Sequence, residues 1–415
     1  MPASGGRYAD GGRRVRLETF ERLLTPEGRA LVDEVRRRAG VESDLALGTR
    51  LRRTHDGELV AAAVTQSHLR GVARTKLGDD AEAMFLTHDA LQQATRSRVA
   101  AHRARRLADG GVGSVVDLGC GVGADLVAFA RAGLTVHGVD LDPVRAAMAA
   151  ANLEALGLEG TVATGDATAV DLTAWGSAFC DPARRDGRGR VFDPRAFSPD
   201  WDFVTRLLDG AAAVKTMPGI DHDLVPDGVE AEWVGDGGDL VEACLWGRPL
   251  ATAARRVTLL PAGATLTDAE LPDEVDQGGP GGYLYEPDDA VGRAGLVGAV
   301  AGLVDGWLLD PHLAYVTSDR LVPTPFARAF RVLEELPFRT KALRAALRER
   351  DVGTLTIKKR GVEVVPERLV RTLGLTGSVP ATVVMTRVAG QGVALLVDPV
   401  PSGPDGTGTA GTRSA

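Results

Sequence analysis

Residues 114–133 read SVVDLGCGVGADLVAFARAG, a short apolar run followed by a glycine-rich turn and by apolar residues at helical spacing. The pattern predicts a strand, a tight turn and a helix, in that order. Gly119, Gly121 and Gly123 suit such a turn because glycine adopts backbone conformations that other residues avoid and lets a ligand approach the backbone closely. A strand, a glycine turn and a helix together form the nucleotide-binding unit of parallel α/β sheets.

Short apolar runs continue after this unit, at 135–140, 161–166, 177–181 and 211–215. Helical segments separate the first three strands, which is typical of a parallel, doubly wound sheet. One of these helices is clearly delimited, with Asp142 as N-cap, Pro143 in the first turn and Gly157 after the last turn. Two alternating runs around GDGG at 235–238 then predict an antiparallel hairpin. The expected fold class is α/β, a Rossmann-like and mostly parallel sheet with an antiparallel terminal hairpin.

Two further regions flank the expected sheet. Apolar residues recur at helical spacing up to about residue 107, which predicts a helical N-terminal region that ends in one long helix over 87–108. Thr25, directly before Pro26, is expected to be a helix N-cap. Short strands and helices interleave again in the last third of the chain. The predicted domains are 1–107 (helical), 108–250 (sheet), 251–282 (linker or loop), 283–398 (small α/β) and 399–415 (disordered tail).

Length and composition limit the classes of protein that are possible. The chain of 415 residues exceeds the roughly 250–300 at which single cores tend to split, so several domains are expected. No apolar run approaches the ~20 residues that span a bilayer, and the first residues contain no apolar signal core, which predicts a cytoplasmic protein without membrane contact. Cys120, Cys180 and Cys244 are far apart and the seven histidines lack HxxxH spacing, so neither a disulfide framework nor a metal is expected.

Charge is distributed unevenly along the chain. The net charge of −8 argues against a protein that coats nucleic acid. Residues 220–290 hold 16 acidic side chains against three arginines, whereas residues 321–372 hold 12 Lys and Arg against six acids, and residues 84–106 hold five Arg against one Asp. Two basic zones on an acidic chain suit a limited, specific contact with an anion, although ordinary solvated helix faces explain them equally well.

The glycine turn by itself fits two classes of cofactor. GCGVGA can be aligned with the dinucleotide pattern GxGxxG/A, and Asp140 falls where either class places an acid on the ribose hydroxyls. Asp117 distinguishes them, because the dinucleotide pattern usually has an apolar residue at this position. A carboxylate here suits a cofactor that carries an ammonium or sulfonium group and no pyrophosphate.

VVDLGCGVG resembles motif I of the class I S-adenosylmethionine (SAM)-dependent methyltransferases, GVDLDP resembles the second motif of this family, and TGDAT the third. The resemblance implies SAM as the cofactor, with the glycine turn around it and Asp117 near its amino-acid end. It also implies Asp140 on the ribose and Asp166 at the adenine. The expected cofactor-binding residues are Asp117, Gly119, Cys120, Gly121, Gly123, Asp140, Leu141, Asp142, Asp166 and Ala167.

FCDPARR at 179–185 ends the fourth expected strand, at the edge of the sheet where ligands bind. It resembles the D/N-P-P-aromatic motif of methyltransferases that act on exocyclic amines of nucleic-acid bases. Asp181 and Pro182 agree with that motif, whereas Ala183 replaces the second proline and Arg184 the aromatic residue. An arginine can stack on a base or clamp a phosphate. Asp181, Pro182 and Arg184 are therefore the expected catalytic residues, with the acceptor atom left open.

The segment LTHDALQQATRSRVAAHRAR before motif I resembles the RNA cap guanine-N2 (trimethylguanosine synthase-like) methyltransferases, in which a helical extension covers the SAM pocket. By that resemblance Gln92, Thr95 and Arg98 would face the site, and helix packing explains them nearly as well. AAANLEALGL at 149–158, which contains Asn152, also recurs in RNA-modifying methyltransferases. Lys215, at the end of the fifth expected strand, would meet a substrate phosphate or pair with Asp181 or another acid.

TLTIKKRGVEVVPERLVRTLGL resembles the THUMP-like domain that follows such methyltransferases in bacteria, and THUMP domains proper bind RNA. The resemblance implies phosphate contacts from basic side chains here and on the preceding helix, and a solvated basic face is the alternative. The side chains concerned are Lys358, Lys359 and Arg360, with Arg339, Lys341, Arg344 and Arg348.

The predicted function is a SAM-dependent methyltransferase acting on a base nitrogen of structured RNA, such as tRNA or rRNA. A small-molecule methyltransferase and an RNA-binding protein with SAM as a structural ligand are alternatives. A nicotinamide-dependent oxidoreductase fits the glycine pattern and conflicts with Asp117.

Overall fold

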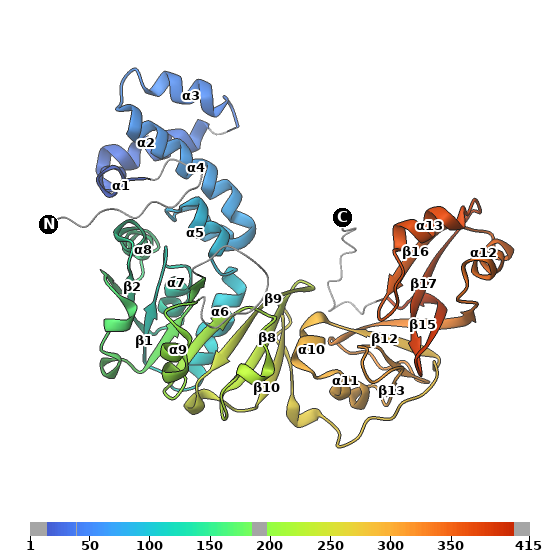
Figure 1. The fold of residues 1–415 in the computed structure, drawn as a ribbon. Coiled ribbons are helices and arrows are strands. Elements are labelled where there is room, and N and C mark those ends of the chain that lie inside the picture. Colours follow the sequence, from blue (N-terminus) through green and yellow to red (C-terminus); the bar gives the residue numbers. More distant parts are fainter. Residues whose placement is uncertain (1–14, 39, 185–196, 402–415) are drawn as a thin grey trace. The chain divides into compact units, whose positions relative to one another are not determined.

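The computed structural model describes residues 15–38, 40–184 and 197–401. The chain forms two compact units, Met1–Lys215 and Thr216–Ala415 (Figure 1). The division falls inside the range 108–250 that was predicted as one domain, and the predicted domain boundaries stay predictions.

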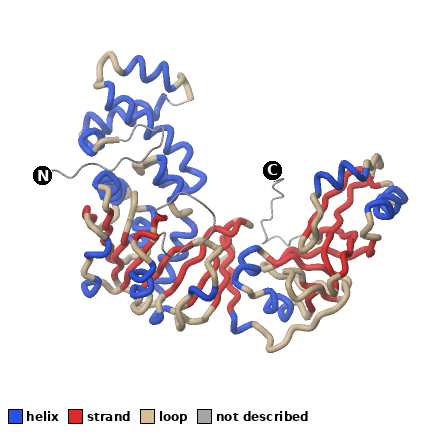
Figure 2. The backbone as a smooth tube through the Cα atoms, viewed as in Figure 1, coloured by secondary structure: helices blue, strands red, loops and turns tan. Residues whose placement is uncertain are grey.

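The first unit begins with helices and loops, and the sheet starts only at residue 114 (Figure 2). Thr25 accepts a hydrogen bond from the Gly28 N–H at 3.2 Å, which confirms the predicted cap. Phe20, Leu31 and Leu69 belong to one buried core. The prediction of a helical region is confirmed. Its helices are α1 (Leu17–Leu24), α2 (Pro26–Arg38), α3 (Asp44–Leu51), α4 (Gly57–Leu77), α5 (His88–Gln93) and α6 (Ser97–Asp109), with a 3-10 turn, η1 (Gly78–Glu82), before α5.

The single long helix predicted over 87–108 is wrong, because two helices, α5 and α6, occupy this segment and break at residues 94–96. In a continuous helix the carbonyls of Leu91 and Gln92 would accept from the N–H groups four residues later. Lys76 Nζ donates to them instead, at 2.9 and 2.7 Å. The Thr95 hydroxyl inside the break donates to Asp125 at 2.8 Å. These tertiary hydrogen bonds replace the helical ones. The helix is therefore interrupted at residues 94–96, although the apolar residues have helical spacing.

The sheet strands of the first unit are all parallel, in the order β7-β4-β1-β2-β3. They are β1 (Ser114–Leu118), β2 (Thr135–Asp140), β3 (Thr161–Thr164), β4 (Ser177–Cys180) and β7 (Ala212–Thr216), within two residues of the predicted limits. Helices α7 (Ala124–Arg131) and α8 (Pro143–Ala155) connect β1, β2 and β3, and α9 (Trp201–Leu207) precedes β7. Asp142 caps α8 as predicted, accepting from the Val144 N–H at 2.9 Å. The parallel order brings the carboxyl ends of the strands to one edge.

Shorter elements complete this unit. The 3-10 turns η2 (Ala167–Ala169) and η3 (Leu172–Ala174) follow β3, and β5 (Ala183–Arg184) pairs with β6 (Phe197–Ser198) after the Asp-Pro pair. The residues between β5 and β6 lie outside the described part of the chain.

The second unit opens with the predicted antiparallel hairpin, formed by β8 (Glu230–Asp236) and β9 (Asp239–Trp246). Two strands follow where a linker was predicted over 251–282, namely β10 (Arg255–Leu260), which is parallel to β8, and β11 (Ala264–Thr267), which is antiparallel to β10. The linker interpretation is therefore wrong for residues 255–267. Its glycine and proline at 261–263 form only the turn between these strands, and the pairing with β8 depends on a tertiary neighbour that local composition cannot show.

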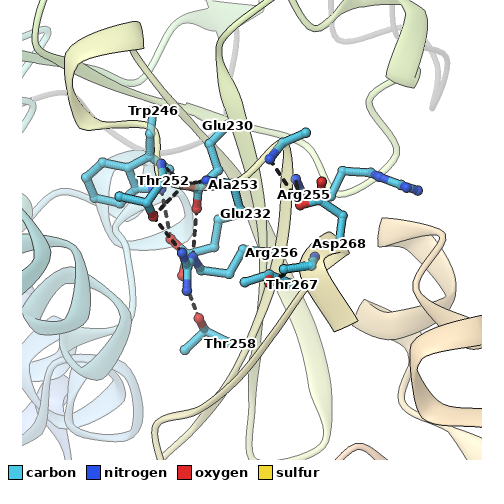
Figure 3. A network of polar contacts seen from close by, with 12 residues as sticks. Glu230, Glu232, Trp246, Thr252, Ala253, Arg255, Arg256, Thr258, Thr267 and Asp268 are labelled. Atoms are coloured by element: carbon cyan, nitrogen blue, oxygen red, sulfur yellow. Dashed lines mark hydrogen bonds and ion pairs between the residues drawn. The ribbon is translucent and has the colours of Figure 1, made fainter. Parts of the chain in front are cut away.

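Buried carboxylates connect these strands (Figure 3). Glu232 on β8 accepts from the Thr258 hydroxyl at 2.6 Å and from the Trp246 indole N–H at 2.8 Å. Glu230, whose side chain is fully buried, accepts from Arg256 Nε at 2.7 Å. A buried charge is tolerated when it is paired and hydrogen-bonded, so this network fixes β8, β9 and β10 against each other.

A second, mostly antiparallel sheet follows, in the order β13-β14-β12-β15-β18-β17-β16. Only its β16–β17 pair is parallel among the described strand pairs of this sheet. The prediction that strands and helices interleave here is confirmed. The strands are β12 (Tyr283–Pro287), β13 (Trp307–Leu308), β14 (Val316–Ser318), β15 (Ala327–Leu336), β16 (Val352–Lys359), β17 (Val379–Val388) and β18 (Gln391–Pro399), and the helices are α10 (Asp289–Ala294), α11 (Val297–Leu303), α12 (Thr340–Glu349) and α13 (Pro366–Leu373).

Candidate active site

The glycine turn between β1 and α7 forms a cradle of open backbone. Gly119, Gly121 and Gly123 have φ values of +94°, +57° and +83°, in the region that favours glycine. A Cβ at Gly119 or Gly121 would meet no heavy atom within 4 Å, so the space beside these two residues is free for a ligand. At Gly123 a Cβ would lie 3.2 Å from the Ala149 side chain, which shows that this glycine serves close packing against α8.

Asp140 at the carboxyl end of β2 is held by the turn. Its Oδ2 accepts from the Gly121 N–H at 2.9 Å and its Oδ1 from the Asp142 N–H at 2.8 Å. Each carboxylate oxygen keeps a further lone pair, so Asp140 can still accept hydrogen bonds from ribose hydroxyls. Leu141 beside it is 68% exposed, although it is a large apolar residue. An aromatic ring lying on Leu141 would cover this surface.

Asp166 and Cys120 differ in environment. The backbone N–H and the hydroxyl of Thr168 both donate to Asp166, and these bonds lower the pKa of this exposed carboxyl. Ala167 after it is buried. Cys120 is buried, and this burial, followed by the charges of Asp117 and Asp140, raises the pKa of its thiol.

Asp117 at the end of β1 lies in the centre of an acidic cluster. It is only 2% exposed. Burial, and then the nearby charges of Asp125, Asp181 and Asp140, hold its pKa well above the usual range, and Arg103 opposes them. A buried site with an excess of carboxylates favours a cationic ligand, and SAM carries an ammonium and a sulfonium group.

Arg103 and Asp125 form a buried ion pair next to this cluster. Their side chains are 1% and 10% exposed, and the Arg103 guanidinium lies 4.6 Å from the centre of the Phe179 ring on β4. Asp125 also accepts from the Thr95 hydroxyl. Sequence reasoning missed this pair, because the two residues lie on different helices and share no motif. Only the position of Asp125 in the first turn of the helix after the glycine turn was a usable signal.

Asp181 follows β4 and is paired with Lys215 on β7. Lys215 Nζ donates to Asp181 Oδ2 at 2.7 Å and to the Thr95 hydroxyl at 3.2 Å. The structure shows the expected ion pair of Lys215 with Asp181, and the expected contact with a substrate phosphate stays a prediction. Pro182 is buried, and the side chain of Arg184 lies outside the described part of the chain. The Asp-Pro pair thus lies at the same sheet edge as the glycine turn, with a fixed carboxylate.

The three residues expected on the preceding helix are separated by the break. Thr95 is buried and reaches both Asp125 and Lys215. Gln92 is exposed, and its backbone carbonyl accepts from Lys76. Arg98 is exposed on α6. The structure therefore brings only Thr95 into contact with the cluster through the described hydrogen bonds.

The expected phosphate contacts of the second unit are partly occupied. Lys358 Nζ donates to Glu286 at 2.6 Å and lies 5.4 Å from the centre of the Phe330 ring. Arg360 is 3.7 Å from Asp289 and lies over the Tyr315 ring. Lys359 alternates with these two along the strand and is exposed.

The basic helix α12 begins after Arg339, its N-cap residue, and two of its arginines have a structural task. Arg344 donates to the Thr372 carbonyl, and Arg348 donates to the Gly374 carbonyl at 3.1 Å. These carbonyls lie at the C-terminal end of α13, where cations are favourable. Lys341 is exposed. The common face expected for 341, 344 and 348 therefore packs in part against the next helix.

Comparison with known proteins agrees with this site. The family described as a methyltransferase domain matches residues 115–179, and the family described as THUMP domain-like matches residues 327–399. Residues 16–73 match a domain of unknown function. Two proteins of Mycobacterium tuberculosis, from strains H37Rv and CDC 1551, are each called an uncharacterized S-adenosylmethionine-dependent methyltransferase. Both are 39% identical to this chain over 352 residues, covering 81% of it and 95% of their own length.

The chain belongs to the S-adenosylmethionine-dependent methyltransferases. A crystal structure of a candidate methyltransferase from Porphyromonas gingivalis W83 shares the fold of this methyltransferase, with a TM-score of 0.74 at 23% identity, over 90% of this chain and 98% of the other. The predicted fold class, the resemblance to class I methyltransferases with a THUMP-like domain, and SAM as cofactor are confirmed. The nicotinamide alternative is excluded.

Two features are absent from residues 15–38, 40–184 and 197–401 of this methyltransferase. No helix there is long and apolar enough to cross a bilayer. No group of three or more His, Cys, Asp or Glu side chains there is arranged to hold a metal ion.

Proposed function

We propose that this methyltransferase acts on a base nitrogen of structured RNA and that Asp181 and Pro182 line the acceptor site. The observation that carries this proposal is the position of Asp181. It stands at the carboxyl end of β4, its Oδ2 is held by Lys215 at 2.7 Å, and it lies close enough to Asp117 to raise the pKa of that residue.

The residues of the glycine turn and the acidic cluster have different roles in this proposal. Bound SAM would supply a methyl group from its sulfonium, whose sulfur would leave as a neutral thioether. Gly119 and Gly121 would leave room for SAM, Asp140 would accept from its ribose hydroxyls, and Asp117 would pair with its ammonium group. Asp181 Oδ1, the oxygen not held by Lys215, accepts a hydrogen bond from the acceptor amine and stabilises the positive charge that develops on that nitrogen. Alignment of this kind supplies roughly 7–11 kcal/mol of the barrier reduction in well-oriented systems.

The support for RNA comes from the second unit. Residues 327–399 match the THUMP domain-like family. Residues 321–372 carry twice as many basic as acidic side chains, and Lys359 and Lys341 are exposed there. A basic surface of limited extent suits the phosphates of one folded RNA.

One observation favours the alternative, a small-molecule acceptor. Lys358 and Arg360 are engaged by Glu286 and Asp289, and Arg344 and Arg348 by α13. Fewer cations than the sequence suggested therefore remain for phosphate. The alternative predicts that reversal of the charge at Lys359 leaves methyl transfer unchanged.

Transfer of tritiated methyl groups to RNA tests the proposal. The protein is incubated with labelled SAM and total RNA from a strain of the source organism that lacks the gene, with wild-type RNA as the control. We expect label only in the RNA of the deletion strain and none with Asp181→Ala, which removes the oxygen that accepts from the amine. Asp44→Ala, at an exposed carboxyl in the first turn of α3 of the same unit, serves as the control and should keep activity.

A second comparison tests the contact with RNA. Lys359→Glu should weaken RNA methylation in a salt-dependent way, and wild-type protein should lose activity as salt rises. Absence of label from both RNA preparations, while calorimetry shows SAM binding, would contradict the RNA proposal. The acceptor would then be sought among small molecules and proteins.

A further inference from the structure

A loop, residues 83–87, connects η1 to α5, and side chains pair with the backbone of its segment 83–86. From α4, Gln66 Nε2 donates to the Leu86 carbonyl at 2.8 Å and Gln66 Oε1 accepts from the Leu86 N–H at 2.9 Å. Arg70 Nε donates to the Met84 carbonyl at 2.9 Å. Buried backbone groups need such partners, so the segment is held in a single position.

Asn152 on α8 also pairs with this segment, and in addition it bonds the glycine turn. Its side chain is fully buried. Oδ1 accepts from the Phe85 N–H at 2.6 Å, and Nδ2 donates to the Phe85 carbonyl at 3.0 Å and to the Val122 carbonyl at 2.8 Å. Val122 lies inside the glycine turn, between Gly121 and Gly123. One amide therefore joins the helical region to the turn that cradles SAM.

The glycine turn needs such a restraint. Glycines have many accessible backbone conformations, and ordering them on ligand binding costs free energy. Asp140 holds the Gly121 N–H from one side of the turn, and Asn152 holds the Val122 carbonyl from the other. The Val122 side chain is buried in the same core as Phe85 and Met148. These contacts hold the turn in place before a ligand arrives, which reduces the ordering cost of binding.

We propose that Asn152 is a positioning residue for the cofactor, holding the glycine turn in its SAM-binding conformation through the Val122 carbonyl. The 83–86 segment takes part in this positioning, because the Phe85 N–H and carbonyl make the other two hydrogen bonds of the Asn152 side chain. Phe85 in turn packs edge-on against Phe20 of α1, with ring centres 5.3 Å apart, and lies under the Arg70 guanidinium. Phe85 and Phe20 of the helical N-terminal region thus contribute to SAM affinity through Asn152.

Gln66 provides a matched control. It is as deeply buried as Asn152 and makes the same pair of bonds to a neighbouring residue of the segment, and no described bond joins it to the glycine turn. We would compare Asn152→Leu with Gln66→Met, measuring the SAM dissociation constant by calorimetry and stability by thermal unfolding. Both variants should unfold at lower temperature. Only Asn152→Leu should also weaken SAM binding, by about tenfold, the effect of one buried hydrogen bond.

Asn152→Asp separates the two functions of the amide. The carboxylate keeps the acceptor for the Phe85 N–H and loses the Nδ2 donor to both the Phe85 and the Val122 carbonyls, so SAM binding should weaken here too. Hydrogen exchange at residues 119–124 should become faster in the Asn152 variants and stay unchanged in Gln66→Met. Equal SAM affinity in wild type and Asn152→Asp, or an equal loss in the Gln66 and Asn152 variants, would overturn the proposal. If Asn152→Leu does not fold, Asn152→Asp and the exchange measurement decide.

Discussion

Because the pKa of Asp117 is raised, we predict that SAM affinity falls as the pH is lowered. The fall should occur in a pH range where an ordinary aspartate stays ionised. Burial and the neighbouring Asp125, Asp140 and Asp181 raise the pKa of Asp117, and Arg103 only partly offsets them. The free protein therefore retains a proton on Asp117 at pH values where an exposed carboxyl has lost it. An ammonium group placed beside Asp117 favours the ionised form, so SAM binding should release this proton.

The magnitude follows from linkage. Below the pKa of Asp117 in the free protein, the SAM dissociation constant should rise by up to about tenfold per pH unit, which is about 1.4 kcal/mol per unit. The contribution of Asp117 to the stability of the free protein changes with pH in the opposite direction. Because the folded-state pKa is the higher one, Asp117 favours folding most below the ordinary value near 3.9, and its contribution declines as the pH rises towards the folded-state pKa. The thermal stabilisation that SAM gives should therefore grow with pH.

Calorimetry between about pH 5 and pH 7.5, in buffers with different ionisation enthalpies, measures both the dissociation constant and the protons released. The upper limit avoids the ammonium group of SAM, because α-amino groups titrate near pH 8. Asp117→Asn is nearly isosteric and cannot titrate, so it should bind SAM weakly with no slope against pH. Asp44→Asn, at an exposed carboxyl of α3, should keep the wild-type slope.

Two results would refute this reasoning. A dissociation constant that stays constant over the whole range, with no proton release, would mean that Asp117 does not change its charge on binding. An equal slope in wild type and Asp117→Asn would assign the slope to another group.

Substitutions at three further places have distinct expected outcomes. Gly121→Ala forces an alanine to φ +57°, which costs about 1–2 kcal/mol, and puts a methyl group into the SAM cradle. It should abolish detectable SAM binding by calorimetry, whereas Gly133→Ala, with φ +84° and equally open space, should lose similar stability and bind SAM normally. Arg103→Met leaves the buried Asp125 carboxylate without its ion-pair partner, so it should lower the free energy of unfolding by about 3–5 kcal/mol in urea titrations. Adding Asp125→Leu to this variant should restore much of the lost free energy. Glu230→Gln, in the buried network of the second unit, should lower the unfolding temperature clearly and leave SAM affinity unchanged; a change of affinity would show that the network reaches the cofactor.

Much of the catalytic sheet could be predicted from the sequence, because its signals are local. Short apolar runs, the glycine turn and the Asp142 cap each depend on residues within a few positions of one another, and all three form as predicted. The hairpin around GDGG is of the same kind. These patterns also carried the resemblance to class I methyltransferases and the expectation of SAM.

The remaining features depend on partners that are distant in sequence. The helix over 87–108 breaks because Lys76 and Asp125 offer better hydrogen bonds than the helix does, and β10 becomes a strand because β8 is beside it. Lys358, read as a phosphate ligand, is paired with Glu286.

By itself, therefore, the sequence determined the sheet, the glycine turn and the cofactor class of this methyltransferase. Only the tertiary structure decided which charged side chains neutralise one another, that Lys215 holds Asp181, and that Asn152 connects the helical region to the SAM turn. The physical reason is that a hydrogen bond or an ion pair acts over a few ångströms in space, whatever the distance along the chain.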